Sequence, residues 1–292
     1  MLLSPFQYHR PRQLAEAHEL LAQYGDDAAV YAGGTELLLA MKARVLRYSN
    51  LIDLKHIAEL GGIRHEGSHI VVGALVSHFR LATDPLMTNL LPTYAALSDN
   101  IANIRVRVSG TLAGNLCFAE PHADPPALLA ALGASVTLAS AGETRSVPVA
   151  EFIEAEFTTV RREDELMTEI HIPLPAAGDR FSYKSFGHLE RPAVGIAAGC
   201  VERGGTFNYK VWAGAIADKP TRLDGLESAL AGVRPENLMD VLPAAAVDAG
   251  STLAAQADLH GSVDYKQHLA AVFIRRAVLE AAGLPSGRGH HD

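Results

Sequence analysis

The stretch Ala32-Gly33-Gly34-Thr35-Glu36-Leu37 lies between two apolar runs and decides how the start of the chain folds. The run before it, residues 28–32, predicts a buried strand, and the run after it, residues 37–42, predicts the start of a helix. The glycines therefore fall at a strand-to-helix turn, where they permit positive φ and close approach of the backbone. Free N–H groups and the helix dipole favour an anion there, and the Thr35 hydroxyl adds a donor. We predict a phosphate-binding loop, with an ordinary tight turn as the alternative.

A second stretch, Ser109-Gly110-Thr111-Leu112-Ala113-Gly114-Asn115, has the same make-up. Glycine accounts for 25 of 292 residues, and Gly-Gly pairs also begin at Gly61 and Gly204. A glycine pair alone therefore does not distinguish a binding loop from a turn. The context of the two stretches gives them weight, and we interpret both as cofactor loops.

The amino-acid composition limits which classes of protein the chain can belong to. Hydrophobic residues make up 48% of the chain, which is enough for a substantial core and for two or three folding units. The 25 Lys+Arg against 33 Asp+Glu give a net charge of −8 without a long basic block, which argues against nucleic acid or an anionic membrane surface as partner. The sequence contains neither a run of about 18 apolar residues nor a signal peptide at its start, so we expect a cytoplasmic protein without a membrane span.

Few residues point to chemistry carried out by this chain itself. The two cysteines, Cys117 and Cys200, provide neither a disulfide framework nor a metal site, and we expect both to be buried. We interpret Glu163-Asp164-Glu165 as a solvated turn, and His65, His69 and His78 as surface or hydrogen-bonded core histidines. No hydrolase, zinc-protease or Walker motif occurs, so the sequence predicts no catalytic residue and no metal ligand.

Hydrophobic patterning predicts alternating strands and helices. Strands are expected over residues 51–54, 70–74, 135–138, 145–149, 181–186, 193–201 and 208–215. Helices are expected over residues 14–21, 75–82, 91–103, 125–132 and 265–282, with Gly25 and Gly133 as stops after the first and the fourth. The proline- and alanine-rich stretch at residues 173–178 predicts a domain boundary.

Several of these blocks together resemble a known family. They are residues 31–37, 51–54, 72–74, 105–115 and 120–126, followed by residues 165–173, 182–184 and Arg191. In this order and spacing they are similar to the FAD-binding medium subunit of molybdenum hydroxylases, the family of the carbon monoxide dehydrogenase medium subunit and the xanthine dehydrogenase flavin domain. The resemblance covers nearly the whole chain.

The resemblance implies an α+β protein with a two-subdomain FAD-binding fold and a C-terminal α+β domain. On this basis we expect a small N-terminal α/β subdomain over residues 1–57 and a larger α+β subdomain over residues 58–175. The C-terminal domain is expected over residues 176–283, and residues 284–292 are expected to form a disordered tail.

The resemblance also assigns cofactor residues. The first loop, around the FAD diphosphate, comprises Tyr31, Ala32, Gly33, Gly34, Thr35, Glu36 and Leu37. The second loop supplies Thr111, Gly114 and Asn115 for the same diphosphate, with Ile101 and Ala102 beside the adenine or ribityl part, and the set is completed by Asp124, Leu166 and Lys184. Ala113 replaces a family glycine, which is harmless only if its φ is negative. The alternatives are a helix N-cap role for Asp124 and a solvated strand position for Lys184.

The implied function is that of an FAD-carrying electron-transfer subunit in a multi-subunit oxidoreductase. A large partner subunit would hold the molybdenum cofactor, and a small partner would hold two [2Fe-2S] clusters that exchange electrons with the FAD. Two cysteines cannot ligate such a cluster, which agrees with this division. A dimer of heterotrimers and an external acceptor such as NAD, quinone or oxygen are expected. A self-contained FAD oxidase or reductase is the alternative, and a scaffold that has lost its flavin is a third.

Overall fold

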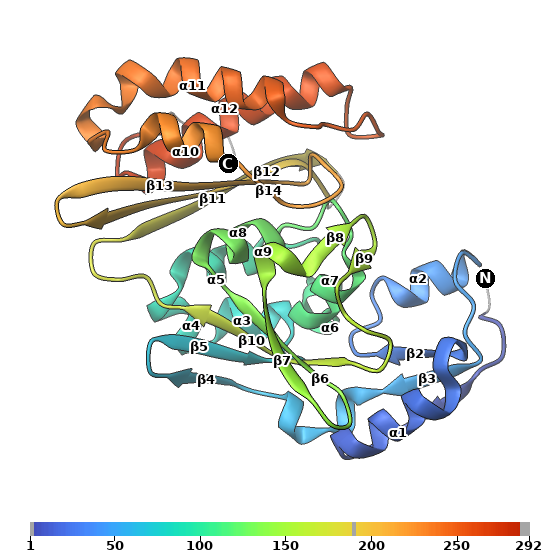
Figure 1. Cartoon of the computed structure of the whole chain (residues 1–292). Helices are drawn as coiled ribbons and strands as arrows, with labels where there is room; N and C mark the ends of the chain where they lie inside the picture. Colours follow the sequence, from blue (N-terminus) through green and yellow to red (C-terminus); the bar gives the residue numbers. More distant parts are fainter. Residues whose placement is uncertain (1–2, 189–190, 287–292) are drawn as a thin grey trace. The chain divides into compact units, whose positions relative to one another are not determined.

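A computed structural model of the chain describes residues 3–188 and 191–286 (Figure 1). It contains two compact units. The first comprises Met1–Ala119 and Ala134–Pro173, and the second comprises Glu120–Gly133 and Leu174–Asp292. The finer division at residues 57 and 175 stays a prediction. Of the predicted tail, residues 287–292 lie outside the described residues.

The first unit opens with a parallel sheet of order β1-β3-β2. Its strands are β1 (Gln7–His9), β2 (Ala28–Tyr31) and β3 (Asn50–Asp53), and its helices are α1 (Leu14–Tyr24) and α2 (Leu37–Lys42). Gly25, at φ +46, ends α1 as expected, since its N–H donates to the carbonyl of Leu21. The predicted strand–loop–helix arrangement around residues 32–36 is confirmed.

The rest of the first unit is built on an antiparallel sheet of order β4-β5-β10-β6-β7. Its strands are β4 (Ile63–Glu66), β5 (His69–Gly73), β6 (Ser135–Ala139), β7 (Thr144–Pro148) and β10 (Leu166–Pro173), and a short hairpin is formed by β8 (Ile153–Ala155) and β9 (Thr158–Thr159). The helices are α3 (His78–Thr83), α4 (Pro85–Leu90), α5 (Pro92–Asp99), α6 (Ile104–Ser109), α7 (Leu112–Phe118) and α9 (Val149–Phe152). The pairing of β6 with β7 confirms the strands expected there.

Three expectations for this unit are wrong. Cys117, which was expected to be buried, is partly exposed. The helix expected over residues 91–103 ends at Asp99, because the chain turns through Ala102, at φ 42, before α6 begins. Glu165 is not part of a solvated turn: it is 2% exposed, and both its carboxylate oxygens accept from Arg145, Oε1 from Nε at 2.6 Å and Oε2 from Nη2 at 2.9 Å. The adjacent acids suggested solvent exposure, but an arginine 20 positions earlier balances this charge.

The second unit is built on the antiparallel sheet β11-β12-β13-β14, covered by helices on both faces (Figure 1). The strands are β11 (Arg180–His188), β12 (Arg191–Arg203), β13 (Thr206–Gly214) and β14 (Thr221–Arg222), and the helices are α8 (Pro125–Leu132), α10 (Asp224–Leu230), α11 (Leu238–Thr252) and α12 (Val263–Ala281). Helix α8 packs on β12 and β13 although its sequence lies within the first half of the chain. Because both faces of β12 are covered, its residues 192–201 are all buried and read as one apolar run.

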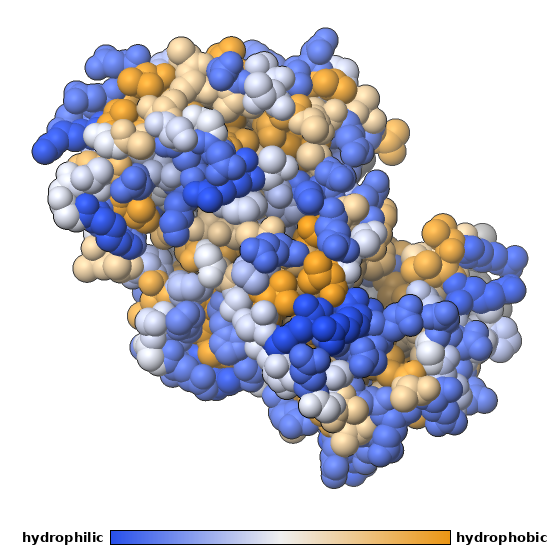
Figure 2. Space-filling model, in the orientation of Figure 1, coloured by the Kyte–Doolittle hydropathy of each residue, from blue (hydrophilic) through white to orange (hydrophobic). Residues whose placement is uncertain are grey.

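Four 3₁₀ turns link these elements among the described residues: Gly25–Asp27, Leu54–His56, Ala58–Leu60 and Pro235–Asn237. The α+β class implied by the resemblance is confirmed. Within residues 3–188 and 191–286, no helix has both the length and the apolar character that a membrane crossing needs. Figure 2 shows apolar side chains over α2, on which Leu39 is 59% exposed, and Val45, three positions after the end of α2, is 77% exposed.

Candidate cofactor site

The two glycines of the first loop are required for different reasons. Gly34 has φ +69, and a Cβ there would lie 2.2 Å from Cε2 of the Tyr31 ring. Gly33 has no such φ, but a Cβ there would lie 2.2 Å from the backbone oxygen of Ser109 and 2.7 Å from Cα of Gly110. Gly34 therefore allows the turn, and Gly33 allows the second loop to lie against the first.

The second loop is tied to the strand-to-helix connection that precedes α3. Residues Ser77 and Thr111 form a β-bridge, and the backbone N–H of His78 donates to the Gly110 carbonyl at 3.0 Å. The Thr111 hydroxyl accepts from the Gly114 N–H at 3.1 Å and so caps α7. Ala113 lies inside α7 and is 5% exposed, so its methyl group is accommodated in a helical backbone.

Thr35 also lies at the junction of the two loops, because a Cβ on Gly110 would be 3.3 Å from its Oγ1 and 3.4 Å from Cδ2 of His78. The structure thus brings the two predicted loops into contact within the first unit. Within the described part of the chain, the backbone N–H groups of Gly33, Gly34 and Thr35 donate to no backbone carbonyl. Such a run of available N–H groups at a strand-to-helix turn suits an anion such as a diphosphate.

Two buried polar side-chain atoms next to these loops have no hydrogen-bond partner among the described residues. They are Asn115 Oδ1 on α7 and His78 Nδ1 at the start of α3. Burial lowers the pKa of His78 to about 4, so its ring is neutral. An unsatisfied buried acceptor costs about 1–3 kcal/mol, which a bound hydroxyl or N–H donor would relieve. These residues therefore fit a polar cofactor. The sequence gave no reason to choose His78, which we expected to be exposed or hydrogen-bonded.

The other predicted residues of the first unit lie around the helices that follow β5. Ile101 and Ala102 form the turn before α6, and Arg107 Nη1 donates to both their carbonyls, at 3.0 and 3.1 Å. This pair of hydrogen bonds holds Ala102 at its φ of 42. Leu166 starts β10, is 2% exposed, and lies on a strand that packs against α7.

Asp124 and Lys184 belong to the second unit. Asp124 occupies the N-cap position of α8, but its side chain makes no capping hydrogen bond; instead its Oδ1 accepts from Tyr183 Oη at 2.7 Å. Burial raises the pKa of Asp124 to about 6, against hydrogen bonds from Tyr183 and Ser185. The charge of Glu120 raises it further.

Lys184 is neighbour to Tyr183 on β11, so its side chain points to the opposite face of the sheet. Its Nζ lies 2.5 Å from Glu280 Oε2 of α12. Lys184 is thus an ion-paired lysine that is 34% exposed, and the sheet separates it from Asp124. Sequence reasoning had placed both residues at one cofactor, and it had not identified Tyr183.

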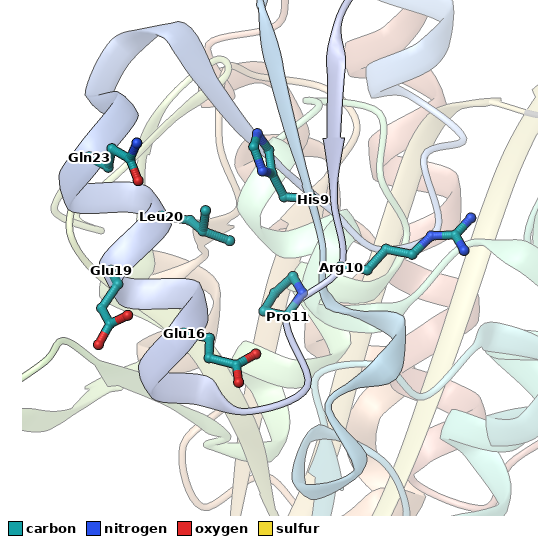
Figure 3. A pocket seen from close by; sticks show the side chains of 7 residues that line it. All are labelled: His9, Arg10, Pro11, Glu16, Glu19, Leu20 and Gln23. Carbon is teal, nitrogen blue, oxygen red and sulfur yellow. The ribbon is translucent and has the colours of Figure 1, made fainter.

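A hollow of 290 Å³ lies elsewhere in the first unit (Figure 3). It is lined by His9, Arg10 and Pro11 after β1 and by Glu16, Glu19, Leu20 and Gln23 on α1. The lining side chains are mostly polar or charged, and His9 Nε2 is already paired with Asn50 Oδ1 at 2.9 Å. None of the predicted cofactor residues lines this hollow.

Comparison with known proteins assigns two regions of the chain to described protein families. Residues 4–175 match the model of the family described as FAD binding domain in molybdopterin dehydrogenase, and residues 192–281 match that described as CO dehydrogenase flavoprotein C-terminal domain. The carbon monoxide dehydrogenase medium chain of Hydrogenophaga pseudoflava is 34% identical over 285 residues, which are 95% of this chain and 97% of that protein. Caffeine dehydrogenase subunit beta of a Pseudomonas species is 32% identical over 234 residues, 78% of each.

Solved structures agree with this placement. The carbon monoxide dehydrogenase of Hydrogenophaga pseudoflava that lacks the Mo-pyranopterin moiety contains a chain with a TM-score of 0.90 and 34% identity, covering 97% of this chain and 99% of that one. Quinoline 2-oxidoreductase from Pseudomonas putida gives a TM-score of 0.89 at 30% identity, with coverage of 97% and 99%.

Proposed function

Because the chain belongs to the family of FAD-binding medium subunits of molybdenum hydroxylases, we propose that it carries electrons between iron–sulfur clusters of a small partner subunit and an external acceptor. It is a flavoprotein subunit of a multi-subunit oxidoreductase. The observation that carries the proposal is the contact of Gly33 with Ser109 and Gly110, which joins two loops around available backbone N–H groups.

The first loop, Tyr31 to Leu37, would hold the FAD diphosphate through its N–H groups, and Thr111, Gly114 and Asn115 would complete that site. The buried Asn115 Oδ1 would accept from a cofactor hydroxyl or N–H group. We propose further FAD contacts for Ile101, Ala102, Asp124 and Leu166; the contact expected for Lys184, which is paired with Glu280, stays a prediction. When bound, FAD supplies both one-electron and two-electron steps, and the chain contributes binding, orientation and the surrounding charge.

The cysteines of this chain support a role without iron. Burial raises the pKa of Cys117 to about 11, against the nearby charge of Arg161, and burial also raises the pKa of Cys200. Both are therefore thiols at neutral pH and poor metal ligands. We propose that two [2Fe-2S] clusters lie in the small partner and the molybdenum cofactor in the large partner, in a cytoplasmic dimer of heterotrimers.

Reconstitution tests the cofactor. The purified chain is incubated with FAD, desalted and examined by absorption spectroscopy; a retained flavin spectrum is expected, and its absence would refute the assignment. Asn115→Leu should weaken FAD binding, because it removes the buried acceptor. Asn100→Leu is the matched control, since Asn100 is exposed and its side chain donates to the backbone carbonyl of Ala96 in α5.

Purification from the native source tests the assembly. Two partner subunits containing iron and molybdenum should copurify with this chain. An active single chain that contains neither metal would instead identify a self-contained FAD oxidase or reductase.

A further inference from the structure

His122 lies at the centre of a charged cluster in the second unit, two positions before Asp124. Its Nδ1 is 2.9 Å from Glu120 Oε1, and its Nε2 is 2.8 Å from Asp258 Oδ2. The backbone N–H of His122 also donates to Glu120 Oε2 at 3.0 Å. Both ring nitrogens therefore face carboxylate oxygens.

This geometry fits the doubly protonated ring. A neutral imidazole has one donor and one acceptor nitrogen, so one of its nitrogens would repel the carboxylate it faces. The hydrogen bond to Glu120 raises the pKa of His122, against burial, and the hydrogen bond to Asp258 raises it further. The ring of His260 lies 4.8 Å from that of His122, and burial and the charge of His122 lower its pKa.

Two basic side chains, one on β12 and one on α12, also belong to the cluster. Arg191 Nη1, at the start of β12, lies 2.6 Å from Glu120 Oε1. Lys266 Nζ, on α12, donates to Asp258 Oδ2 at 2.6 Å, and Lys266 is 1% exposed. Burial raises the pKa of Asp258, but hydrogen bonds from Lys266, the backbone of His260 and His122 lower it to about 2. Positive and negative groups thus alternate, and the ring of His122 links the two carboxylates.

The cluster fixes the turn that leads into α8. The Ala123 N–H donates to the Glu120 carbonyl at 3.0 Å, which closes the turn directly before Asp124. Asp124 itself is buried and held by Tyr183. A change at His122 therefore acts on the turn that directly precedes this buried carboxyl group.

We propose that His122 is a positioning residue for FAD binding: as an imidazolium between Glu120 and Asp258, it fixes the turn that presents Asp124 to the cofactor. This inference rests on the proposed contact between Asp124 and FAD. Loss of the ring proton leaves a nitrogen lone pair facing a carboxylate, which loosens the turn. FAD affinity should therefore fall as pH rises through the pKa of His122, which lies above its ordinary 6.5.

The charged and titratable groups around His122 are Glu120, Asp124, Arg191, Asp258, His260 and Lys266. The pKa of Asp124 is about 6, so the effect of His122 on FAD affinity is measured above that pH. The FAD dissociation constant of the full chain is measured by flavin fluorescence quenching from about pH 7 to about pH 8.5. For the wild type we expect it to rise about tenfold as His122 loses its proton.

His122→Gln should bind FAD about tenfold more weakly at the lower pH and show no further loss at the higher pH. His268→Gln is the matched control, because His268 is an exposed histidine of α12, and it should follow the wild type. Glu120→Gln keeps a hydrogen-bond acceptor but removes a charge, so the pH midpoint should move down; this variant carries the test if His122→Gln does not fold. Urea unfolding of each variant separates loss of binding from loss of folding.

The inference is overturned if His122→Gln keeps the wild-type dissociation constant and pH dependence. Asp124→Asn distinguishes this failure from that of the proposed function. Weak binding by Asp124→Asn with a normal His122→Gln refutes only the positioning role. Normal binding by Asp124→Asn refutes the proposed contact of Asp124 itself.

Discussion

Replacing Gly33 by Ala tests whether the contact between the two loops is needed for FAD. The new Cβ would lie 2.2 Å from the Ser109 oxygen and 2.7 Å from Gly110 Cα, whereas ordinary contact begins at 3.4 Å. Both obstacles are backbone atoms, so the loops themselves must separate. Overpacking of this kind costs about 1–3 kcal/mol.

The free chain can relax by opening the loops, but the FAD-bound chain needs them together, so we expect most of the cost to appear in binding. Because 1.4 kcal/mol corresponds to a tenfold change, the FAD dissociation constant should rise about 5- to 150-fold. Titration of the FAD-free chain, followed by flavin fluorescence, measures this value. Gly142→Ala is the matched control, since a Cβ at Gly142 meets no atom within 4 Å.

Two results would contradict this reasoning. Gly33→Ala with wild-type affinity would show that the cofactor does not require the observed contact. An equal loss of affinity in Gly142→Ala would show that the effect is not specific to the loop junction.

Asp124→Asn should stabilise the FAD-free chain at neutral pH by up to about 3 kcal/mol. Burial raises the pKa of Asp124 from 3.8 to about 6, so the wild-type chain loses stability as pH rises between these values, and the uncharged Asn avoids this loss. Urea unfolding on either side of this window checks it, and a variant less stable than the wild type at pH 7 would contradict it. Glu165→Gln should destabilise the chain by about 3 kcal/mol by leaving Arg145 without its ionic partner. Arg145 lowers the pKa of Glu165, so the stabilisation from this ion pair is fully present above pH 4.5 and is lost as pH falls through the lowered pKa. An unchanged melting temperature of Glu165→Gln at neutral pH would contradict this prediction. Thr111→Ala should cost about 1 kcal/mol through the lost cap on Gly114, and Thr111→Ser should restore it; equal melting of both variants would exclude the capping role.

Local patterns predicted the elements that present the first loop. The apolar run before residue 32 and the one after residue 36 were enough to predict β2 and α2, because burial and helix formation depend mainly on neighbours along the chain. The run at residues 193–201 was likewise predicted as a strand. The order of the motifs along the chain also predicted the family, and the comparisons confirm it over residues 4–175 and 192–281.

Interactions between distant residues could not be predicted in this way. Glu165 was expected in solvent because its neighbours are acidic, yet its environment is set by Arg145. Asp124 was weighed as a helix cap because two prolines follow it, yet its carboxyl accepts from Tyr183, 59 positions later. Each local pattern was compatible with more than one environment, and only the packing selected one.

For the glycine loops, the sequence by itself determined where the chain turns and that Gly34 is suited to a positive φ. The tertiary structure alone decided that Gly33 lies against Ser109 and Gly110. It also decided that His122 and Asp258 lie in one charged cluster. The physical reason is range: backbone conformation and hydrophobic periodicity act between neighbours, whereas close contact and charge pairing depend on which distant segments the folded core brings together.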